Sequence, residues 1–223
     1  NVAHEIRTPL TLIKGPLENI ILKKQVDAET REDLNVMKQN TERLLNLTNQ
    51  LLDFRKTESQ GFRLNFAKCN ITEVLKETHV RFTSLAKQKG LDFTLQVPEK
   101  DFYAHVNQEA FTKIISNLLN NGMKYAESYV HVMLEAPQRD DNNLFRIRTV
   151  NDGVIIPDAM KEEIFKPFVR FNEQEDGKVT TGTGIGLALS RSLAEFHLGT
   201  LVMEAGEESN IFCLTLPVVQ DTT

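Results

Sequence analysis

The sequence predicts an α+β protein in two parts. An N-terminal antiparallel helical hairpin, half of a dimeric four-helix bundle, precedes an α/β sandwich with a mixed, mostly antiparallel sheet. Two observations predict this division. Apolar residues from Val2 to Thr57 recur at helical spacing, whereas the chain after Gly61 alternates between strand-like and helix-like patterns. The length of 223 residues also leaves room for two small domains. We therefore expect domains over 1–60 and 61–223.

Two long helices are expected in the first part. From Val2 to about Ile21 the apolar residues recur at spacings of four or three, with Pro9 and Pro16 inside the pattern, where each removes a backbone donor. The polar stretch 23–32 is the expected turn, and a second helix is expected over 33–57. Because two helices with wide apolar faces cannot bury them alone, we expect a second copy to complete a four-helix bundle.

The second part mixes short strands with helices. Strands are expected over 62–69, 92–97, 129–135, 144–150, 200–205 and 211–218, and helices over 71–88, 107–124 and 187–196. The polar run 138–143 connects the third and fourth of these strands, and the last two strands are expected to pair. This mixture is typical of one sheet backed by a helical layer.

Composition excludes several classes of protein. The formal net charge of -5 argues against a nucleic-acid binder, because proteins that follow phosphates concentrate lysine and arginine. Cys69 and Cys213 have no metal-ligand spacing and are expected to be buried thiols in a reducing compartment. No apolar run approaches the ~18 residues that cross a bilayer, and no signal peptide is visible. Because the chain starts at Asn1 without an initiator methionine, we expect a fragment of a longer protein.

A histidine beside a carboxylate opens the chain. His4 is followed at once by Glu5 and one helical turn later by Thr8. This pattern indicates nucleophilic or acid–base chemistry, because a carboxylate can orient an imidazole and stabilise its charged form. Taken alone, the pattern also fits an ordinary surface histidine.

Two polar segments further along are typical of a nucleotide pocket, although each has a simpler interpretation. Asn117 and Asn121 lie four residues apart on one helix face, with Lys124 about a turn later. Amide oxygens can ligate Mg²⁺, and a lysine can contact phosphates. The same spacing fits a polar helix face. The run 151–153, Asn-Asp-Gly, directly follows a strand and would on its own be a turn.

A glycine-rich loop at 182–186, Gly-Thr-Gly-Ile-Gly, opens the last expected helix. Its backbone N–H groups and the helix N-terminus favour an anion. The loop fits neither the dinucleotide-binding nor the Walker pattern, and a flexible glycine turn remains the alternative. Upstream, Phe165, Phe168 and Arg170 supply two aromatic anchors and a cation, although the phenylalanines also fit a core. The polar stretch 172–181 is typical of a lid.

The order of these segments resembles the catalytic core of a sensor histidine kinase, in which a helical dimerisation and phosphoacceptor domain precedes a GHKL-type ATP-binding domain. The resemblance covers about Val2 to Val218. It implies that His4 accepts the phosphoryl group, that Glu5 holds the second ring proton, and that Thr8 orients water when a partner is dephosphorylated. The motifs also resemble those of hybrid two-component sensors of gut Bacteroidetes.

The same resemblance implies a site for ATP and Mg²⁺ within 61–223. Asn121 matches the magnesium-binding asparagine of the family, and Asn117 matches its partner one turn earlier. The remaining matches border the phosphates, the base or the lid: Lys124, Tyr125, Gly153, Phe165, Phe168, Arg170, Gly182, Thr183, Gly184, Ile185, Gly186 and Leu187.

One motif departs from the family pattern Asp-x-Gly-x-Gly, whose aspartate accepts a hydrogen bond from the adenine amino group. Asn151 stands where that aspartate is expected, Asp152 is displaced by one position, and Ile155 replaces the second glycine. Asn151 can still accept this bond, but without charge assistance the bond is weaker by about 1 kcal/mol. A loop shift that gives Asp152 the role is the alternative. We therefore expect ATP binding that is weaker than usual for the family.

The resemblance implies ATP-dependent autophosphorylation on His4, followed by transfer to an aspartate of a receiver domain, either on a separate protein or on the same parent chain. It also implies a homodimer through 1–60 and the cytoplasmic portion of a bacterial inner-membrane sensor, attached only through parent segments beyond this chain. The alternative is a degenerate kinase that acts as a dimeric scaffold or phosphatase. A third interpretation, an ATPase of the chaperone or mismatch-repair type, leaves the His-Glu helix unexplained.

Overall fold

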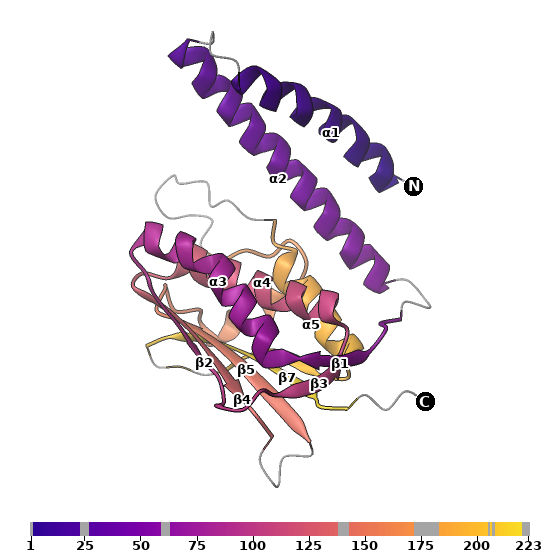
Figure 1. Ribbon diagram of the computed structural model, residues 1–223, viewed down its shortest axis with the longest axis vertical. Coiled ribbons are helices and arrows are strands. Elements are labelled where there is room, and N and C mark those ends of the chain that lie inside the picture. Colours follow the sequence, from indigo (N-terminus) through magenta and orange to yellow (C-terminus); the bar gives the residue numbers. More distant parts are fainter. Residues whose placement is uncertain are drawn as a thin grey trace. The chain divides into compact units, whose positions relative to one another are not determined.

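The computed structural model describes residues 2–22, 27–58, 63–137, 143–171, 183–204, 206 and 208–219. The chain divides into two compact units, 1–59 and 60–223 (Figure 1). Among the described residues, no helix is both long enough and apolar enough to cross a bilayer.

The first unit is a helical hairpin of α1 (Val2–Ile21) and α2 (Ala28–Glu58). Helix α1 continues through both of its prolines. Helix α2 begins at Ala28 rather than at 33, so the expected turn over 23–32 is too long. The reason is a local cap: Asp27 Oδ1 accepts a hydrogen bond from the backbone N–H of Thr30 at 2.8 Å, and Asp27 Oδ2 accepts one from its hydroxyl at 2.7 Å. An aspartate in this position satisfies donors that a helix start leaves unpaired.

The two helices of the hairpin pack through a narrow seam. Leu17 is buried, and so are Thr41 and Thr48, whose hydroxyls donate to backbone carbonyls four residues earlier. An ion pair joins the helices, with Lys14 Nζ 3.1 Å from Glu42 Oε1. Much apolar surface stays outside this seam, on the exposed side chains of Leu12, Ile13, Val36, Met37 and Leu44.

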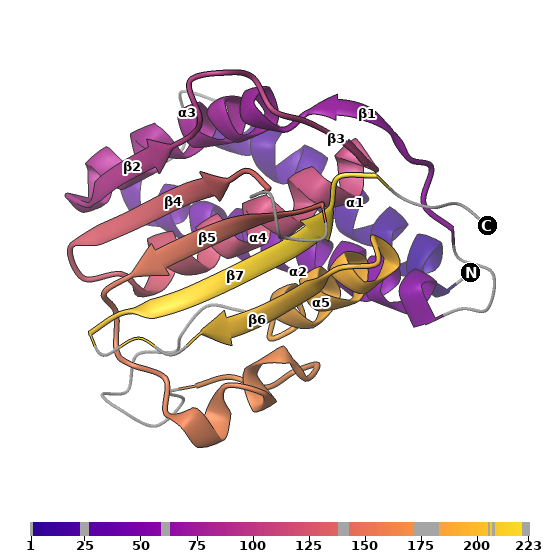
Figure 2. The ribbon, with the colours of Figure 1, turned by 90° about the horizontal axis from the view of Figure 1, so that it is seen from below.

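The second unit is a five-stranded sheet covered on one face by three helices (Figure 2). The strand order is β2-β4-β5-β7-β6; β2 pairs with β4 in parallel and all other neighbours are antiparallel. A separate ribbon pairs β1 with β3. The strands are β1 (Ala67–Asn70), β2 (Asp92–Gln96), β3 (Tyr103–Val106), β4 (Tyr129–Glu135), β5 (Leu144–Asn151), β6 (Thr200–Glu204) and β7 (Asn210–Pro217); the helices are α3 (Ile71–Lys89), α4 (Gln108–Tyr125) and α5 (Gly186–Phe196).

The core lies between the sheet and the helical layer. Along β5, every second residue from Phe145 to Asn151 is buried, so these side chains face the helices, and the alternate residues face the other side. Helices α4 and α5 contribute mainly apolar residues to this layer, among them Phe111, Ile114, Leu118 and Leu189. Both cysteines are free and buried, as predicted.

The predicted α+β class is confirmed, with a mixed and mostly antiparallel sheet. Two short elements differ from the prediction. The strand expected over 62–69 is shorter and shifted, because only β1 pairs, with β3 as its partner. Strand β3 itself was not predicted. Two short 3-10 turns, Asp158–Met160 and Glu163–Phe165, connect β5 to the segment that precedes α5.

Candidate functional site

Helices α4 and α5 are joined by Asn117. Its Nδ2 donates hydrogen bonds to Gly186 O at 3.2 Å and to Ser190 Oγ at 3.1 Å, at the start of α5. A Cβ atom added at Gly186 would lie 3.7 Å from Asn117 Cγ. Two of the predicted motifs therefore meet here. Because Nδ2 is turned toward α5, a cation or its bound water would meet Asn117 through Oδ1.

The start of α5 has no side-chain cap. Asn70 and Asn107 cap α3 and α4 by accepting hydrogen bonds from the backbone N–H groups of Glu73 and Ala110, whereas Ile185, before α5, makes no such bond. The first N–H groups of a helix have no partner within the helix, and they favour a negative charge. The start of α5 can therefore receive an anionic group.

The glycine-rich loop is held against the aromatic segment by backbone contacts. Gly184 has φ of 69°, and its carbonyl oxygen accepts a hydrogen bond from Phe168 N at 2.9 Å. A Cβ atom added at Gly184 would lie 2.8 Å from Phe168 Cα, which is a clash. Thr183 Oγ1 accepts a hydrogen bond from Ile185 N at 3.2 Å and closes the turn. The loop conformation therefore requires glycine at 184.

The two phenylalanines of the aromatic segment have different environments. Phe165 is 4% exposed, and the Arg191 guanidinium lies 3.7 Å from the centre of its ring. Arg191 also donates to Glu162 Oε2 at 2.7 Å. Phe168 is 63% exposed and has φ of 66°. The interpretation of these phenylalanines as core residues is therefore confirmed for Phe165, and it is wrong for Phe168.

The end of β5 lies against the end of α4. A Cβ atom added at Gly153 would lie 2.0 Å from Tyr125 O, so only glycine fits between the two segments. On α4, Lys124 Nζ donates to Tyr125 Oη at 2.6 Å and lies 4.3 Å from the centre of the tyrosine ring. The backbone of Tyr125 therefore lies beside Gly153, and Lys124 is held on the tyrosine ring.

Asp152 binds the backbone that connects α4 to β4. Its carboxylate accepts hydrogen bonds from the N–H groups of Glu127, Ser128 and Tyr129, at 2.9 to 3.1 Å, and from the Ser128 hydroxyl. Burial alone would raise the pKa of Asp152, but the Ser128 hydroxyl and these N–H groups outweigh burial and lower that pKa well below its usual range. Asp152 is thus an ionised structural acceptor, which argues against a loop shift that brings it to the base.

Asn210, which was not predicted as a site residue, holds the loop after β5. Its Oδ1 accepts from Ile156 N at 3.0 Å, and its Nδ2 donates to Gly153 O at 3.2 Å and Val154 O at 3.0 Å. Asn210 pairs across the sheet with Asn151. No sequence motif marks it, because its role depends on the register between β5 and β7.

For the remaining predicted residues, the structure gives only the element to which they belong or their burial. Asn121 is half-buried, one turn after Asn117, and Arg170 is also half-buried. Leu187 follows Gly186 in the first turn of α5. Gly182 and the expected lid over 172–181 lie outside the described residues. His4, Glu5 and Thr8 belong to α1, and their side chains also lie outside the described part of the chain.

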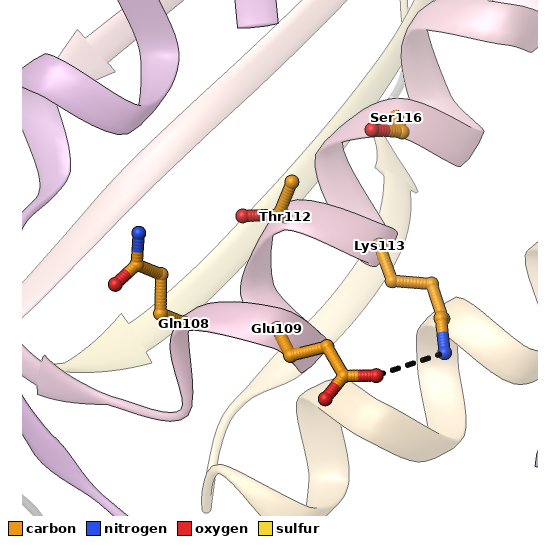
Figure 3. A pocket seen from close by; sticks show the side chains of 5 residues that line it. All are labelled: Gln108, Glu109, Thr112, Lys113 and Ser116. Atoms are coloured by element: carbon orange, nitrogen blue, oxygen red, sulfur yellow. Dashed lines mark ion pairs between the residues drawn. The ribbon is translucent and has the colours of Figure 1, made fainter. Parts of the chain in front are cut away.

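A shallow hollow lies beside the first turns of α4 (Figure 3). In the figure Lys113 points toward Glu109, and their Nζ and Oε1 atoms are 3.9 Å apart. Its described lining consists of Gln108, Glu109, Thr112, Lys113 and Ser116, none of which was predicted for the nucleotide site.

The chain is similar to known families and proteins over most of its length. The family described as histidine kinase-, DNA gyrase B-, and HSP90-like ATPase matches residues 106–220, and the His Kinase A (phospho-acceptor) domain matches residues 1–60. Histidine kinase P4 of Formosa agariphila is 32% identical over 98% of this chain, which spans only 16% of that relative's length.

Two solved structures share the fold. Full-length ShkA in complex with AMPPNP has a TM-score of 0.81 at 21% identity, over 100% of this chain and 46% of that one. Histidine kinase ThkA in complex with the response regulator TrrA has a TM-score of 0.68 at 24% identity, over 97% and 60% of the two chains. The chain therefore belongs to the histidine kinase-, DNA gyrase B- and HSP90-like ATPase family and, with its phospho-acceptor domain, is the catalytic core of a sensor histidine kinase.

Proposed function

We propose that this chain transfers the γ-phosphoryl group of ATP to His4 and that the phosphoryl group then passes to an aspartate of a receiver domain. The observation that carries the proposal is the meeting of separate motifs in the second unit. Asn117 contacts Gly186, Gly153 fits against Tyr125, and Gly184 fits against Phe168. Each motif alone has a simpler interpretation, but these contacts between separate motifs support a nucleotide site in this unit.

In the proposed reaction, the neutral imidazole of His4 attacks the γ-phosphorus through Nε2. A nitrogen–phosphorus bond forms as the bond from the γ-phosphorus to the β,γ-bridging oxygen breaks, and ADP leaves with that electron pair. Glu5 holds the proton on the other ring nitrogen and stabilises the developing imidazolium. Thr8, one turn along, would orient a water molecule when the receiver is dephosphorylated.

The residues present fit a bound Mg²⁺–ATP. Asn121 and Asn117 offer amide oxygens from one face of α4, which is a donor type that Mg²⁺ accepts. Mg²⁺ would neutralise developing charge on the phosphates. The uncapped start of α5 and Lys124 supply positive potential, with Arg170 a further cation for the γ-phosphate. Gly182 to Leu187 would border the phosphates, and Phe165 holds the segment that leads to them.

The base of the nucleotide would meet Asn151. This side chain is 3% exposed, and its Nδ2 has no hydrogen-bond partner among the described residues. A buried polar atom without a partner is costly, and a ligand can supply the missing bond. Since an amide lacks the charge of an aspartate, we expect ATP to bind about tenfold more weakly than with aspartate at this position.

The hairpin would form a homodimer. Its exposed apolar side chains lie on both helices, so a second hairpin could bury them in a four-helix bundle. The receiver would dock on the phosphoacceptor helices; ThkA, which shares the fold, was solved with its response regulator. We further propose that this chain is the cytoplasmic portion of a membrane-anchored bacterial sensor whose anchor lies in other parts of the parent protein.

Incubation with γ-labelled ATP and Mg²⁺ tests the proposed function. Acid-labile label is expected on the chain, and it should disappear in His4→Ala. His131→Ala, which removes another of the five histidines, is the matched control and should keep the label. Absence of label from a chain that binds ATP would contradict the kinase and support the scaffold alternative.

A further inference from the structure

Two asparagines face each other at the ends of neighbouring strands but are bonded very differently. Asn151 on β5 and Asn210 on β7 are register partners, and each is 3% exposed. Asn210 uses both ends of its amide in three hydrogen bonds to the 153–156 loop. No described residue pairs with Asn151 Nδ2. Both asparagines are register partners at the same end of the sheet, yet among the described residues only the Nδ2 of Asn210 has hydrogen-bond partners. Strand geometry alone therefore does not explain the unpaired Nδ2 of Asn151, and we attribute it to the site.

A second unpaired polar group lies on the same face of β5. Thr149, two residues before Asn151, is 1% exposed, and its Oγ1 also has no partner among the described residues. Both side chains face the helical layer. The two groups share a chemical property: a hydroxyl and a primary amide can each act as donor or acceptor.

The nearby carboxylate of Asp152 does not fix whether the Asn151 amide and the Thr149 hydroxyl act as donors or as acceptors. Asp152 points to the connection between α4 and β4, where four donors hold it. Position 151 itself carries an amide, not the acceptor-only carboxylate. Among the described residues, no partner therefore fixes the orientation of the Asn151 Nδ2 or of the Thr149 hydroxyl.

Purine bases differ in which hydrogen-bond donors and acceptors they present at the edge formed by C6 and N1. Adenine has an amino donor at C6 and an acceptor at N1, whereas guanine and hypoxanthine have an oxo acceptor at C6 and a donor at N1. A carboxylate can accept from the 6-amino group but repels a 6-oxo group. An amide matches either edge, because rotation by about 180° exchanges Oδ1 and Nδ2.

We propose that Asn151 makes this site tolerant of the purine 6-substituent, so that it binds 6-oxopurine nucleoside triphosphates as well as ATP. The proposal rests on the proposed function, in which Asn151 meets the base. It makes Asn151 a specificity-determining residue whose amide reverses according to the base. Thr149 assists, since its hydroxyl can reorient with the amide.

The test compares the dissociation constants of ATP and inosine triphosphate by calorimetric titration of the wild-type chain in Mg²⁺. Inosine triphosphate has the 6-oxo edge but lacks the 2-amino group of guanine, so it isolates the 6-substituent. The two constants should agree within about tenfold. In Asn151→Asp, ATP should bind more tightly and inosine triphosphate more weakly, which shifts their ratio by at least about tenfold.

Asn210→Asp is the matched control, because it introduces the same change at the register partner. It should weaken both nucleotides by loosening the 153–156 loop and leave their ratio unchanged. A wild-type preference for ATP above about tenfold would overturn this inference while leaving the kinase proposal intact. Failure of both nucleotides to bind at millimolar concentration would instead overturn the proposed function. The wild-type comparison decides the matter even where Asn151→Asp does not fold.

Discussion

At the scale of single residues, the site depends on backbone positions that tolerate no side chain and on buried polar groups with defined partners. Gly153 and Gly184 allow backbone segments to approach more closely than a Cβ atom permits. Asp152, Asn210 and His197 each bind backbone groups far away in the sequence. The motifs identified the glycines, but the partners of these polar side chains depend on which distant segments the fold brings together.

Replacing Gly184 by alanine should unfold the loop locally and abolish nucleotide binding. The added Cβ would clash with Phe168, and φ of 69° disfavours alanine, so we expect a loss of about 1–3 kcal/mol of unfolding free energy. Urea denaturation and nucleotide titration measure both effects. Gly15→Ala in α1 is the control, because a Cβ there meets nothing within 4 Å. Unchanged affinity in Gly184→Ala would contradict the assigned loop.

His197 should make the second unit less stable in mild acid. Its ring is buried; Nδ1 donates to Leu193 O at 2.7 Å, and Nε2 accepts from Asn107 N at 3.1 Å. Burial lowers the pKa of His197 below its ordinary 6.5, although these hydrogen bonds act in the opposite direction. The folded state therefore resists a proton that the unfolded state takes up, and stability should fall as pH drops below about 6.5. Urea unfolding across this range should show the slope in wild type and a smaller one in His197→Gln. An identical slope in both would rule out His197 as its source.

At the scale of elements, the spacing of apolar residues predicts the ends of the longer helices and strands well, whereas a helix start that depends on a local cap is not predicted. Helices α3 and α4 and strands β4 and β5 have ends within a residue of prediction, because each has a long and regular apolar pattern. Strand β3 was missed because four residues carry too little pattern. Helix α2 starts earlier than expected because the Asp27 cap lies in a segment whose polarity predicts a turn.

The end of α5 has a leucine where the backbone favours glycine. Leu198 has φ of 57°; its N–H donates to Glu195 O, and Gly199 N–H donates to Ala194 O, which together make a Schellman ending. Because the Leu198 side chain is exposed, Leu198→Gly should relieve backbone strain at little packing cost. We expect a gain of about 1 kcal/mol, seen as a higher melting temperature. Leu198→Ala is the control and should give no comparable gain; a lower melting temperature in the glycine variant would be the opposite of this expectation.

At the scale of the whole molecule, the sequence predicts a division near residue 60, where the two compact units of the structure also meet along the chain. The nucleotide site within the second unit stays a prediction. Order along the chain identified motifs that are individually weak, and the fold brings several of them into contact. The roles of Asn210 and Thr149 needed the structure, since both depend on which strand faces lie against the helices. The exposed apolar surface of the hairpin also belongs to this scale, because we propose that a second copy of the chain buries it.

The chain should therefore dimerise through the hairpin. A charged residue at Leu12 or Leu44 would lie on the exposed apolar surface, so Leu12→Glu with Leu44→Glu should shift the chain to monomer in analytical ultracentrifugation. Val80→Glu, at an exposed apolar residue of α3, is the matched control and should leave the association unchanged. If the control disrupts the dimer and the hairpin variant does not, the interface lies in the second unit.

We propose that ATP bound in the second unit phosphorylates a histidine in the first. Mapping the phosphoryl group by mass spectrometry at alkaline pH tests it most directly, since cleavage after Arg7 releases the peptide Asn1–Arg7 with His4 as its only histidine. After incubation with ATP and Mg²⁺, we expect this peptide to be phosphorylated at His4 in the wild type and to stay unmodified in Gly184→Ala. A phosphoryl group at another residue, or an unmodified His4 in a chain that binds ATP, would contradict it.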